Sequence, residues 1–135
     1  MRKLTVKGQK RKLWDLFREY ILTRDKNICQ WCLKSKNPRG LDVHHIIPKG
    51  RCRNAGYYQE ENCMVLCDYC HAFKSKIYPH EFDVFQDEWL KKHFKETQEN
   101  LGIKYQTIVL WSTELYETKY KVIQELYDKL KEAKC

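Results

Sequence analysis

The chain lacks any long hydrophobic run. None of its apolar stretches approaches the roughly 18 to 20 residues that a membrane-spanning helix needs, and its mean hydropathy is −0.77. The first seven residues are basic and contain no apolar segment of the kind found in signal peptides, so we do not expect secretion. Internal repeats and low-complexity tracts are also absent. With 135 residues, 42% of them hydrophobic, the sequence predicts one soluble domain or a small core with a helical appendage.

Acidic residues are scarce in the first part of the chain. Residues 1–80 contain 17 Lys and Arg against 7 Asp and Glu, whereas residues 81–135 contain 9 against 11, so the net charge of +8 comes from the first part. Residues 1–12 hold six basic residues and no acid. A polyanion is the natural partner of such a surface because neutralised phosphates release counterions. A solvated basic face without a partner explains the charge equally well.

Hydrophobic periodicity predicts three helices and two short strands. We expect an amphipathic helix over 9–24, strands over 41–47 and 63–66, and a helix over 82–99. A knuckle should pass into a helix over 67–77. A last helix, with Thr113 as a plausible N-cap, carries the seam Tyr116, Tyr120, Ile123, Tyr127 and Leu130. We expect this seam to pack on the rest of the chain, with a coiled-coil dimer as the alternative.

Two CxxC pairs, Cys29/Cys32 and Cys67/Cys70, are separated by 34 residues. Two residues between the cysteines let both sulfurs of a pair reach one ion, and two pairs complete a tetrahedral Cys₄ shell typical of structural zinc. Seven cysteines in a chain that we expect in a reducing compartment favour metal over disulfides. Thiol redox chemistry and chance buried cysteines remain alternatives.

Between and after the pairs lie His44-His45-Ile46-Ile47-Pro48 and Asn62, and the second pair is followed directly by His71. With the CxxC pairs, these motifs resemble the HNH endonuclease family of ββα-metal nucleases over residues 26–76. The resemblance implies an α+β fold, with a small ββα-metal core and a structural zinc knuckle flanked by an N-terminal helix and C-terminal helices. His45, Asn62 and His71 would supply the H, N and H.

The resemblance also implies roles for these residues. His45 would be the general base, and a neutral imidazole suits that task near neutral pH. His44 and His71 would bind one catalytic divalent ion, and Asn62 would orient the base or its loop. Two imidazole ligands favour borderline ions such as Ni²⁺, Co²⁺ or Zn²⁺, but Mg²⁺ or Mn²⁺ stays possible because phosphate and water oxygens would fill the other positions.

Each role has an alternative. Adjacent histidines in a strand point to opposite faces, so either His44 or His45 could simply be buried and hydrogen-bonded. His71 could instead join the zinc shell, and Asn62 could be only a turn or cap residue. Basic side chains near the motif could hold DNA phosphates, and Tyr57 and Tyr58 could stack on bases or simply pack. These candidate DNA contacts are Lys49, Arg51, Arg53, Lys74 and Lys76.

A weaker resemblance links residues 13–25 and 70–78 to NinG-type phage recombination proteins, although that family often has Asn where this chain has His71. It implies a bacterial or phage-encoded cytoplasmic protein that acts on branched or recombining DNA. No base-reading element is visible in the sequence, so strong sequence specificity is not expected.

These observations predict a basic arm over 1–12, an HNH nuclease domain with its leading helix over 13–80, and a helical extension over 81–135 that packs on the core. The expected function is metal-dependent DNA cleavage by a monomer, or by a homodimer formed through the C-terminal helix, with no membrane partner. A non-catalytic zinc module that binds nucleic acid is the main alternative. An adaptor that presents the C-terminal seam to a partner is a third.

Overall fold

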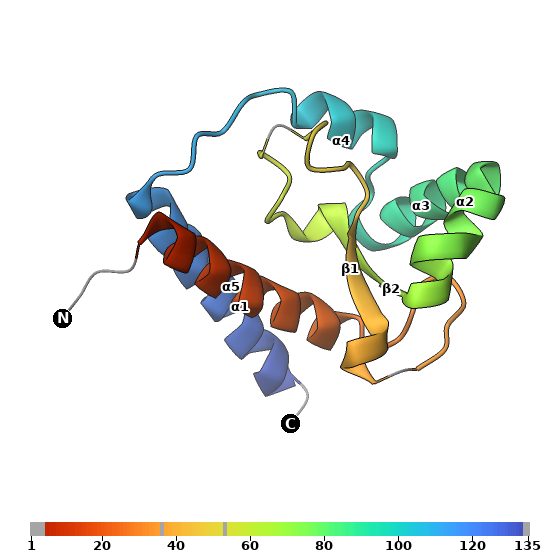
Figure 1. Cartoon of the computed structure of the whole chain (residues 1–135), viewed down its shortest axis with the longest axis horizontal. Coiled ribbons are helices and arrows are strands. Elements are labelled where there is room, and N and C mark those ends of the chain that lie inside the picture. Colours follow the sequence, from red (N-terminus) through yellow and green to blue (C-terminus); the bar gives the residue numbers. More distant parts are fainter. Residues whose placement is uncertain (1–4, 36, 53, 134–135) are drawn as a thin grey trace.

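A two-stranded antiparallel sheet lies among five α-helices in the computed structural model, which describes residues 5–35, 37–52 and 54–133 (Figure 1). The predicted α+β class is confirmed. In chain order the elements are α1 (Val6–Arg24), β1 (Leu41–His45), β2 (Cys63–Cys67), a π-helical segment (Cys70–Lys74) that continues into α2 (Ser75–Ile77), α3 (Pro79–Phe94), α4 (Gln98–Lys104) and α5 (Thr113–Ala133). Short 3₁₀ turns at Pro38–Gly40 and Glu60–Asn62 precede the two strands.

Helix α1 begins earlier than its hydrophobic pattern indicates. The Thr5 hydroxyl accepts a hydrogen bond from the Gly8 amide at 3.0 Å, which caps the helix and makes the basic segment helical from Val6 onwards. Residues 6–12 of the predicted basic arm therefore form the first turns of α1. Further along, Leu13, Phe17 and Ile21 are fully buried and hold the helix on the core.

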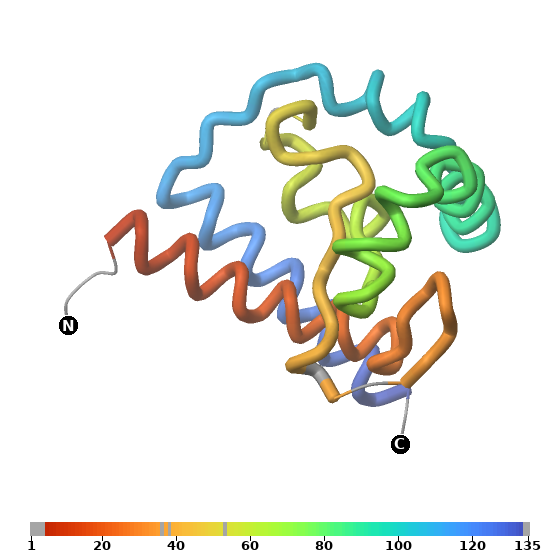
Figure 2. Tube along the Cα trace, turned by 45° about the vertical axis from the view of Figure 1, so that its right-hand side comes forward, coloured from red at the N-terminus to blue at the C-terminus, as the bar shows by residue number. Residues whose placement is uncertain are grey.

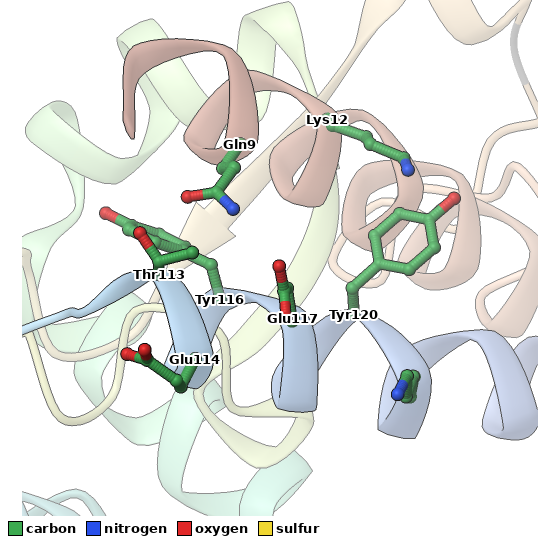
Figure 3. A pocket seen from close by; sticks show the side chains of 8 residues that line it. Gln9, Lys12, Thr113, Glu114, Tyr116, Glu117 and Tyr120 are labelled. Atoms are coloured by element: carbon green, nitrogen blue, oxygen red, sulfur yellow. The ribbon is translucent and has the colours of Figure 1, made fainter. Parts of the chain in front are cut away.

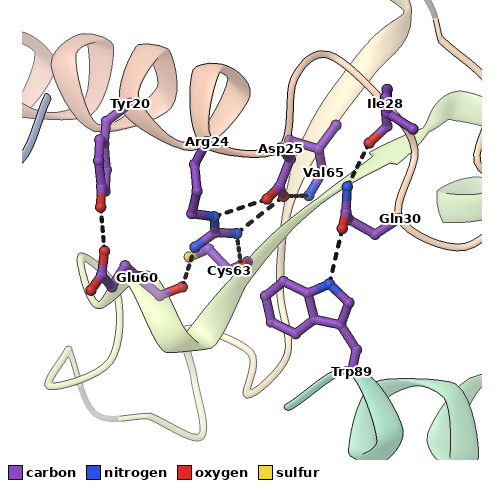
Figure 4. Close-up of polar contacts among 9 residues, drawn as sticks. All are labelled: Tyr20, Arg24, Asp25, Ile28, Gln30, Glu60, Cys63, Val65 and Trp89. Atoms are coloured by element: carbon purple, nitrogen blue, oxygen red, sulfur yellow. Dashed lines mark hydrogen bonds and ion pairs between the residues drawn. The ribbon is translucent and has the colours of Figure 1, made fainter. Parts of the chain in front are cut away.

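The two strands pair from Leu41 opposite Cys67 to His45 opposite Cys63. All five residues of β2 are buried, and its second edge is paired with side chains and with the Gln30 amide, which donates to the Val65 carbonyl at 2.9 Å. Arg24 donates to the Cys63 carbonyl at 2.6 Å, and Asp25 accepts from the Val65 amide at 3.0 Å (Figure 4). These bonds satisfy backbone groups that an uncovered edge would leave unpaired.

The first strand ends two residues before the predicted limit at Ile47. Beyond His45, the backbone amides of Ile46 and Ile47 both pair with Asn62 instead of with residues of β2. The Asn62 carbonyl accepts from the Ile46 amide at 2.8 Å, and its side-chain oxygen accepts from the Ile47 amide at 2.8 Å. The chain therefore leaves the sheet although its side chains are still apolar and buried.

The single helix expected over 82–99 is wrong, because α3 and α4 are separate helices. Lys95 takes the left-handed conformation, with φ at 56°, and its amide bonds back to carbonyls of the last turn of α3. Thr97 then caps α4 by accepting from the Asn100 amide at 3.1 Å. A left-handed residue followed by a new cap reverses the chain here.

Helix α5 lies alongside α1 in both views of the chain (Figures 1 and 2). The pair is parallel, because Lys12 contacts Tyr120 and Tyr20 contacts Tyr127 further along both helices. Tyr116 and Ile123 of the seam are buried within the same chain. The N-cap of α5 lies one residue before the predicted Thr113. The Ser112 hydroxyl accepts a hydrogen bond from the Leu115 amide at 3.2 Å.

Among the described residues, no helix has both the length and the apolar content needed to cross a lipid bilayer.

Candidate nuclease site

Four cysteine sulfurs lie together where the two CxxC pairs meet. One sulfur each from Cys29, Cys32, Cys67 and Cys70 falls within 4.8 Å of every other, and the Cys32 and Cys67 sulfurs are 3.8 Å apart. Sulfurs bound to one tetrahedral zinc at about 2.3 Å are separated by roughly 3.8 Å. The four side chains therefore fit a single zinc ion.

The local backbone supports this donor set. The first pair lies in a tight loop closed by an antiparallel bridge between Ile28 and Ser35. In the second pair, the Cys70 amide points at the Cys67 sulfur at 3.4 Å. Burial opposes ionisation of Cys29, but backbone amides, including those of Cys32 and Cys67, outweigh it and lower the pKa of this thiol to about 7, whereas burial and the neighbouring cysteines raise the pKa of the Cys32 and Cys70 thiols. Thiolates are the form that binds zinc.

His44 extends from β1 toward α3. Its Nε2 lies 2.8 Å from Oε1 of Gln86, and its ring centroid lies 5.2 Å from that of His71. Burial, with smaller effects of the neighbouring His71 and His45, lowers the pKa of His44 to about 4 against the opposing effect of the Gln86 hydrogen bond. This imidazole is therefore neutral at physiological pH, as a metal ligand must be.

His71 comes from the π-helical segment that follows the second cysteine pair. Its Nδ1 lies 3.1 Å from a carboxylate oxygen of Asp42, which leaves Nε2 free. It is not part of the cysteine cluster, so the structure does not support the alternative in which it binds the structural zinc. Two imidazoles bound to one ion at about 2.1 Å hold their ring centroids roughly 5 Å apart. The spacing of His44 and His71 fits that arrangement.

His45 points away from His44, as the alternation of a strand requires. Its Nε2 lies 2.9 Å from the Tyr57 carbonyl oxygen. A carbonyl can only accept, so Nε2 carries the proton and Nδ1 holds the lone pair. The ring stacks on Tyr57 at 4.6 Å and on Trp14 of α1 at 5.8 Å between centroids. Burial, with a smaller effect of the Lys49 charge, lowers the pKa of His45 despite the bond to Tyr57.

Asn62 holds the loop that carries the partner of His45. Its side chain is fully buried and donates to the Ile47 carbonyl at 3.1 Å and to the Gly56 carbonyl at 3.0 Å. Gly56 is required beside it, because a Cβ there would lie 2.6 Å from the Tyr105 ring. A fully buried amide cannot touch a substrate, so Asn62 acts on the site by positioning this loop.

Residues 29–76 match the family model described as HNH endonuclease. This segment is similar to HNH endonucleases over about a third of the chain, and we call it the HNH domain below. The match confirms the resemblance seen in the sequence and leaves α1, α3, α4 and α5 outside the family segment. The searches of curated proteins and of solved structures each found no match.

The basic residues of the HNH domain lie on both sides of the histidines. Lys49 and Arg51 are exposed in the loop after β1, and the Lys49 amine lies 5.2 Å from the Tyr57 ring centroid. Lys74 lies over Trp31 at 4.2 Å, and Lys76 is exposed on α2. Arg53, the remaining predicted DNA contact, lies outside the described residues.

The two tyrosines that could stack on bases, Tyr57 and Tyr58, lie in different surroundings. Tyr58 is buried, with edge-on contacts to Phe17 and Trp111, so it packs in the core. Tyr57 is half-buried and stacks on His45.

Three contributors to the site were missed by sequence reasoning. Asp42 could have been found, because it lies two residues before His44 and therefore on the same face of β1. The Tyr57 carbonyl and the Gln86 side chain depend on how a loop and a helix return to the sheet. No local pattern signals either contact.

One groove of the described surface is lined by none of these histidines. It has a volume of about 510 Å³ and lies between α1 and α5, where Gln9, Lys12, Thr113, Tyr116 and Tyr120 line it (Figure 3). None of its lining residues is a histidine or a cysteine. We therefore place the candidate chemistry at the histidines of the HNH domain and not in this groove.

Proposed function

We propose that the protein is a metal-dependent endonuclease that hydrolyses phosphodiester bonds in DNA. The observation that carries this proposal is the hydrogen bond from His45 Nε2 to the Tyr57 carbonyl. It leaves Nδ1 unprotonated, as a general base requires, one residue along the strand from the imidazole pair of His44 and His71. The HNH family of the segment supports the same activity.

In the proposed reaction, Nδ1 of His45 takes a proton from a water molecule that attacks phosphorus. The new bond forms between the water oxygen and phosphorus, and the bond from phosphorus to the 3′ oxygen breaks. The products carry a 5′-phosphate and a 3′-hydroxyl, whose proton comes from solvent. The stacked rings of Trp14 and Tyr57 hold the base in place, so little reorientation is needed at the moment of attack.

His44 and His71 would bind one divalent ion. When bound, this ion supplies positive charge to the phosphate and to the leaving oxygen. Asp42 orients the His71 ring so that Nε2 faces away from the carboxylate and is free to bind. Water and phosphate oxygens would complete the coordination, so Mg²⁺, Mn²⁺, Ni²⁺ and Zn²⁺ all belong in the test.

Lys49 and Arg51 on one side, with Lys74 and Lys76 on the other, would hold the phosphates next to the cut. Because these contacts address the backbone and not base edges, we propose weak sequence specificity. The resemblance to NinG-type proteins makes branched DNA a substrate to test, in a phage or prophage setting.

The experiment is a cleavage assay with supercoiled plasmid, a four-way DNA junction, single-stranded DNA and RNA. Each substrate is incubated with Mg²⁺, Mn²⁺, Ni²⁺, Zn²⁺ or EDTA. Wild type is compared with His45→Ala and with His93→Ala, a matched change at an exposed histidine near the end of α3. We expect wild type and His93→Ala to cut DNA with at least one ion, and EDTA to stop both.

We expect His45→Ala to lose about 10²- to 10⁴-fold in rate, the usual contribution of a general base, while it keeps its zinc and binds DNA. Equal cutting by wild type and His45→Ala would show that the base is assigned wrongly. No cutting of any substrate by wild type, together with DNA binding, would favour the non-catalytic zinc module.

A further inference from the structure

A chain of side-chain amides runs from His44 into the helices that follow the HNH domain. Nε2 of His44 lies 2.8 Å from Oε1 of Gln86 on α3. The Gln86 amide nitrogen donates to Oε1 of Gln98 on α4 at 3.2 Å, and the Gln98 amide nitrogen donates to the Asp83 carbonyl at 2.9 Å.

The Asp83 carbonyl, the last acceptor, determines which group donates and which accepts in all three hydrogen bonds. A backbone carbonyl can only accept, so Gln98 must turn its nitrogen toward Asp83 and its oxygen toward Gln86. Gln86 must then donate to Gln98 and turn its own oxygen toward His44. Facing an acceptor, His44 carries its proton on Nε2 and keeps its lone pair on Nδ1.

The surroundings hold both glutamines in these orientations. The Gln86 side chain is buried with 3% of its surface exposed, so an unpaired amide group there would be costly. Gln98 is fixed at the start of α4, where its backbone amide donates to the Asp87 carboxylate at 2.8 Å. Both residues lie beyond the family segment of residues 29–76.

We infer that Gln86, held by Gln98, is a positioning residue that sets the tautomer of His44 and so fixes Nδ1 as the nitrogen this ligand offers to a divalent ion. The inference rests on the proposed function in treating His44 as a metal ligand. It assigns to α3 and α4 a part in the nuclease site, since histidine ligands in metal sites usually donate their second ring nitrogen to such a partner. Asp42 does the same for His71 from within the HNH domain.

The test uses zinc-loaded, tag-free protein and four variants. Gln86→Met removes the acceptor at similar volume, Gln86→Glu keeps an acceptor, and Gln98→Met frees the Gln86 amide to turn. Gln124→Met is the matched control, because the Gln124 amide donates to Asp128 on the same helix, α5, away from the histidines. Long-range ¹H–¹⁵N spectra of ¹⁵N-histidine protein report the His44 tautomer, and calorimetric titration with Ni²⁺ reports affinity. Zinc content and the unfolding midpoint are measured for every variant.

We expect the Nε2-protonated tautomer in wild type, Gln86→Glu and Gln124→Met, with similar affinities for Ni²⁺. Gln86→Met should populate both tautomers and bind Ni²⁺ about 10- to 100-fold more weakly, the usual loss when such a partner is removed. Gln98→Met should show a smaller loss of the same kind. If Gln86→Met does not fold, Gln86→Glu and Gln98→Met still carry the comparison.

The inference is overturned if Gln86→Met keeps both the tautomer and the affinity of wild type, or if Gln86→Glu loses as much as Gln86→Met. A separate variant, His44→Ala, tests the proposed function on its own. If it binds Ni²⁺ as wild type does, His44 is not a ligand, whatever the tautomer spectra show.

Discussion

Polar side chains hold the loop between β1 and β2 that contacts His45. Next to Asn62, the Glu61 carboxylate accepts from the Tyr105 hydroxyl at 2.8 Å and pairs with the Lys104 amine at 3.2 Å. These contacts fasten the end of α4 to the loop, and the Tyr105 ring closes over Gly56. Ordinary charged and polar residues outside the HNH domain thereby support the backbone around His45.

The Glu61 contacts make stability depend on pH. Burial raises the pKa of this carboxyl, but its own backbone amide and the Tyr105 and Lys104 contacts outweigh burial and lower the pKa below the ordinary value. The stabilisation is therefore complete above the unfolded pKa of about 4.3 and is lost as the pH falls through the folded pKa. Urea unfolding between pH 7 and pH 3 should show a smaller loss of stability for Glu61→Gln than for wild type. Glu88→Gln, an exposed change on α3, should follow wild type; a Glu61→Gln curve parallel to wild type would contradict this assignment.

At the scale of single residues, the sequence predicted the histidines and cysteines of the candidate site better than the residues that form hydrogen bonds with them. The motif and the alternation of a strand placed His44 and His45 on opposite faces, and the spacing of the cysteines predicted one cluster. Gln86 could not be foreseen, because its contact with His44 joins residues 42 positions apart through tertiary packing. Asn62 was expected near the base, but only the structure shows that it is fully buried.

The helical elements follow their hydrophobic patterns in the middle and depart from them at the ends. The boundary between α3 and α4 falls at Lys95-Glu96, where neither glycine nor proline interrupts the sequence. The helical pattern therefore predicted one helix through this point. The break depends on a lysine in a conformation that favours glycine, and on Thr97 as the next cap.

Lys95→Gly should consequently stabilise the protein. A left-handed non-glycine residue costs about 1 to 2 kcal/mol, and the greater freedom of glycine in the unfolded chain returns roughly half of this. We expect a net gain of about 0.5 to 1 kcal/mol in the free energy of unfolding, measured by urea denaturation. The matched change Lys92→Gly, inside α3, should cost about 0.5 to 1 kcal/mol. A loss of stability in Lys95→Gly equal to that in Lys92→Gly would contradict the role of this residue as a helix terminator.

At the scale of the whole molecule, the four-cysteine cluster and the α1–α5 pair each join distant parts of the chain. The cluster joins the loop after α1 to the end of β2. The two CxxC pairs in the sequence already indicated this connection. The sequence alone did not determine what the C-terminal seam packs against, because the same residues could face a second copy of the chain. Burial of Tyr116 and Ile123 against the same chain uses that seam internally.

Removing zinc should therefore affect the whole fold. Four thiolates that bind one ion couple its binding energy to folding, so we expect one zinc per chain by elemental analysis and a loss of several kcal/mol in stability after chelation. Cys70→Ser should lose most of the zinc, whereas Cys52→Ala, at a buried thiol outside the cluster, should keep it. Full zinc content in Cys70→Ser would contradict the four-cysteine site.

The parallel pairing of α1 and α5 has a mechanical consequence. Because the two helices run in the same direction, the N-terminus leaves from one end of the pair and the C-terminus from the other (Figure 1). A force that pulls the two termini apart loads the contacts of the interface together, in shear, instead of opening them one after another as in an antiparallel hairpin. The first and last helices thus hold together the two ends of an 88-residue segment, which includes the candidate site residues His44, His45 and His71.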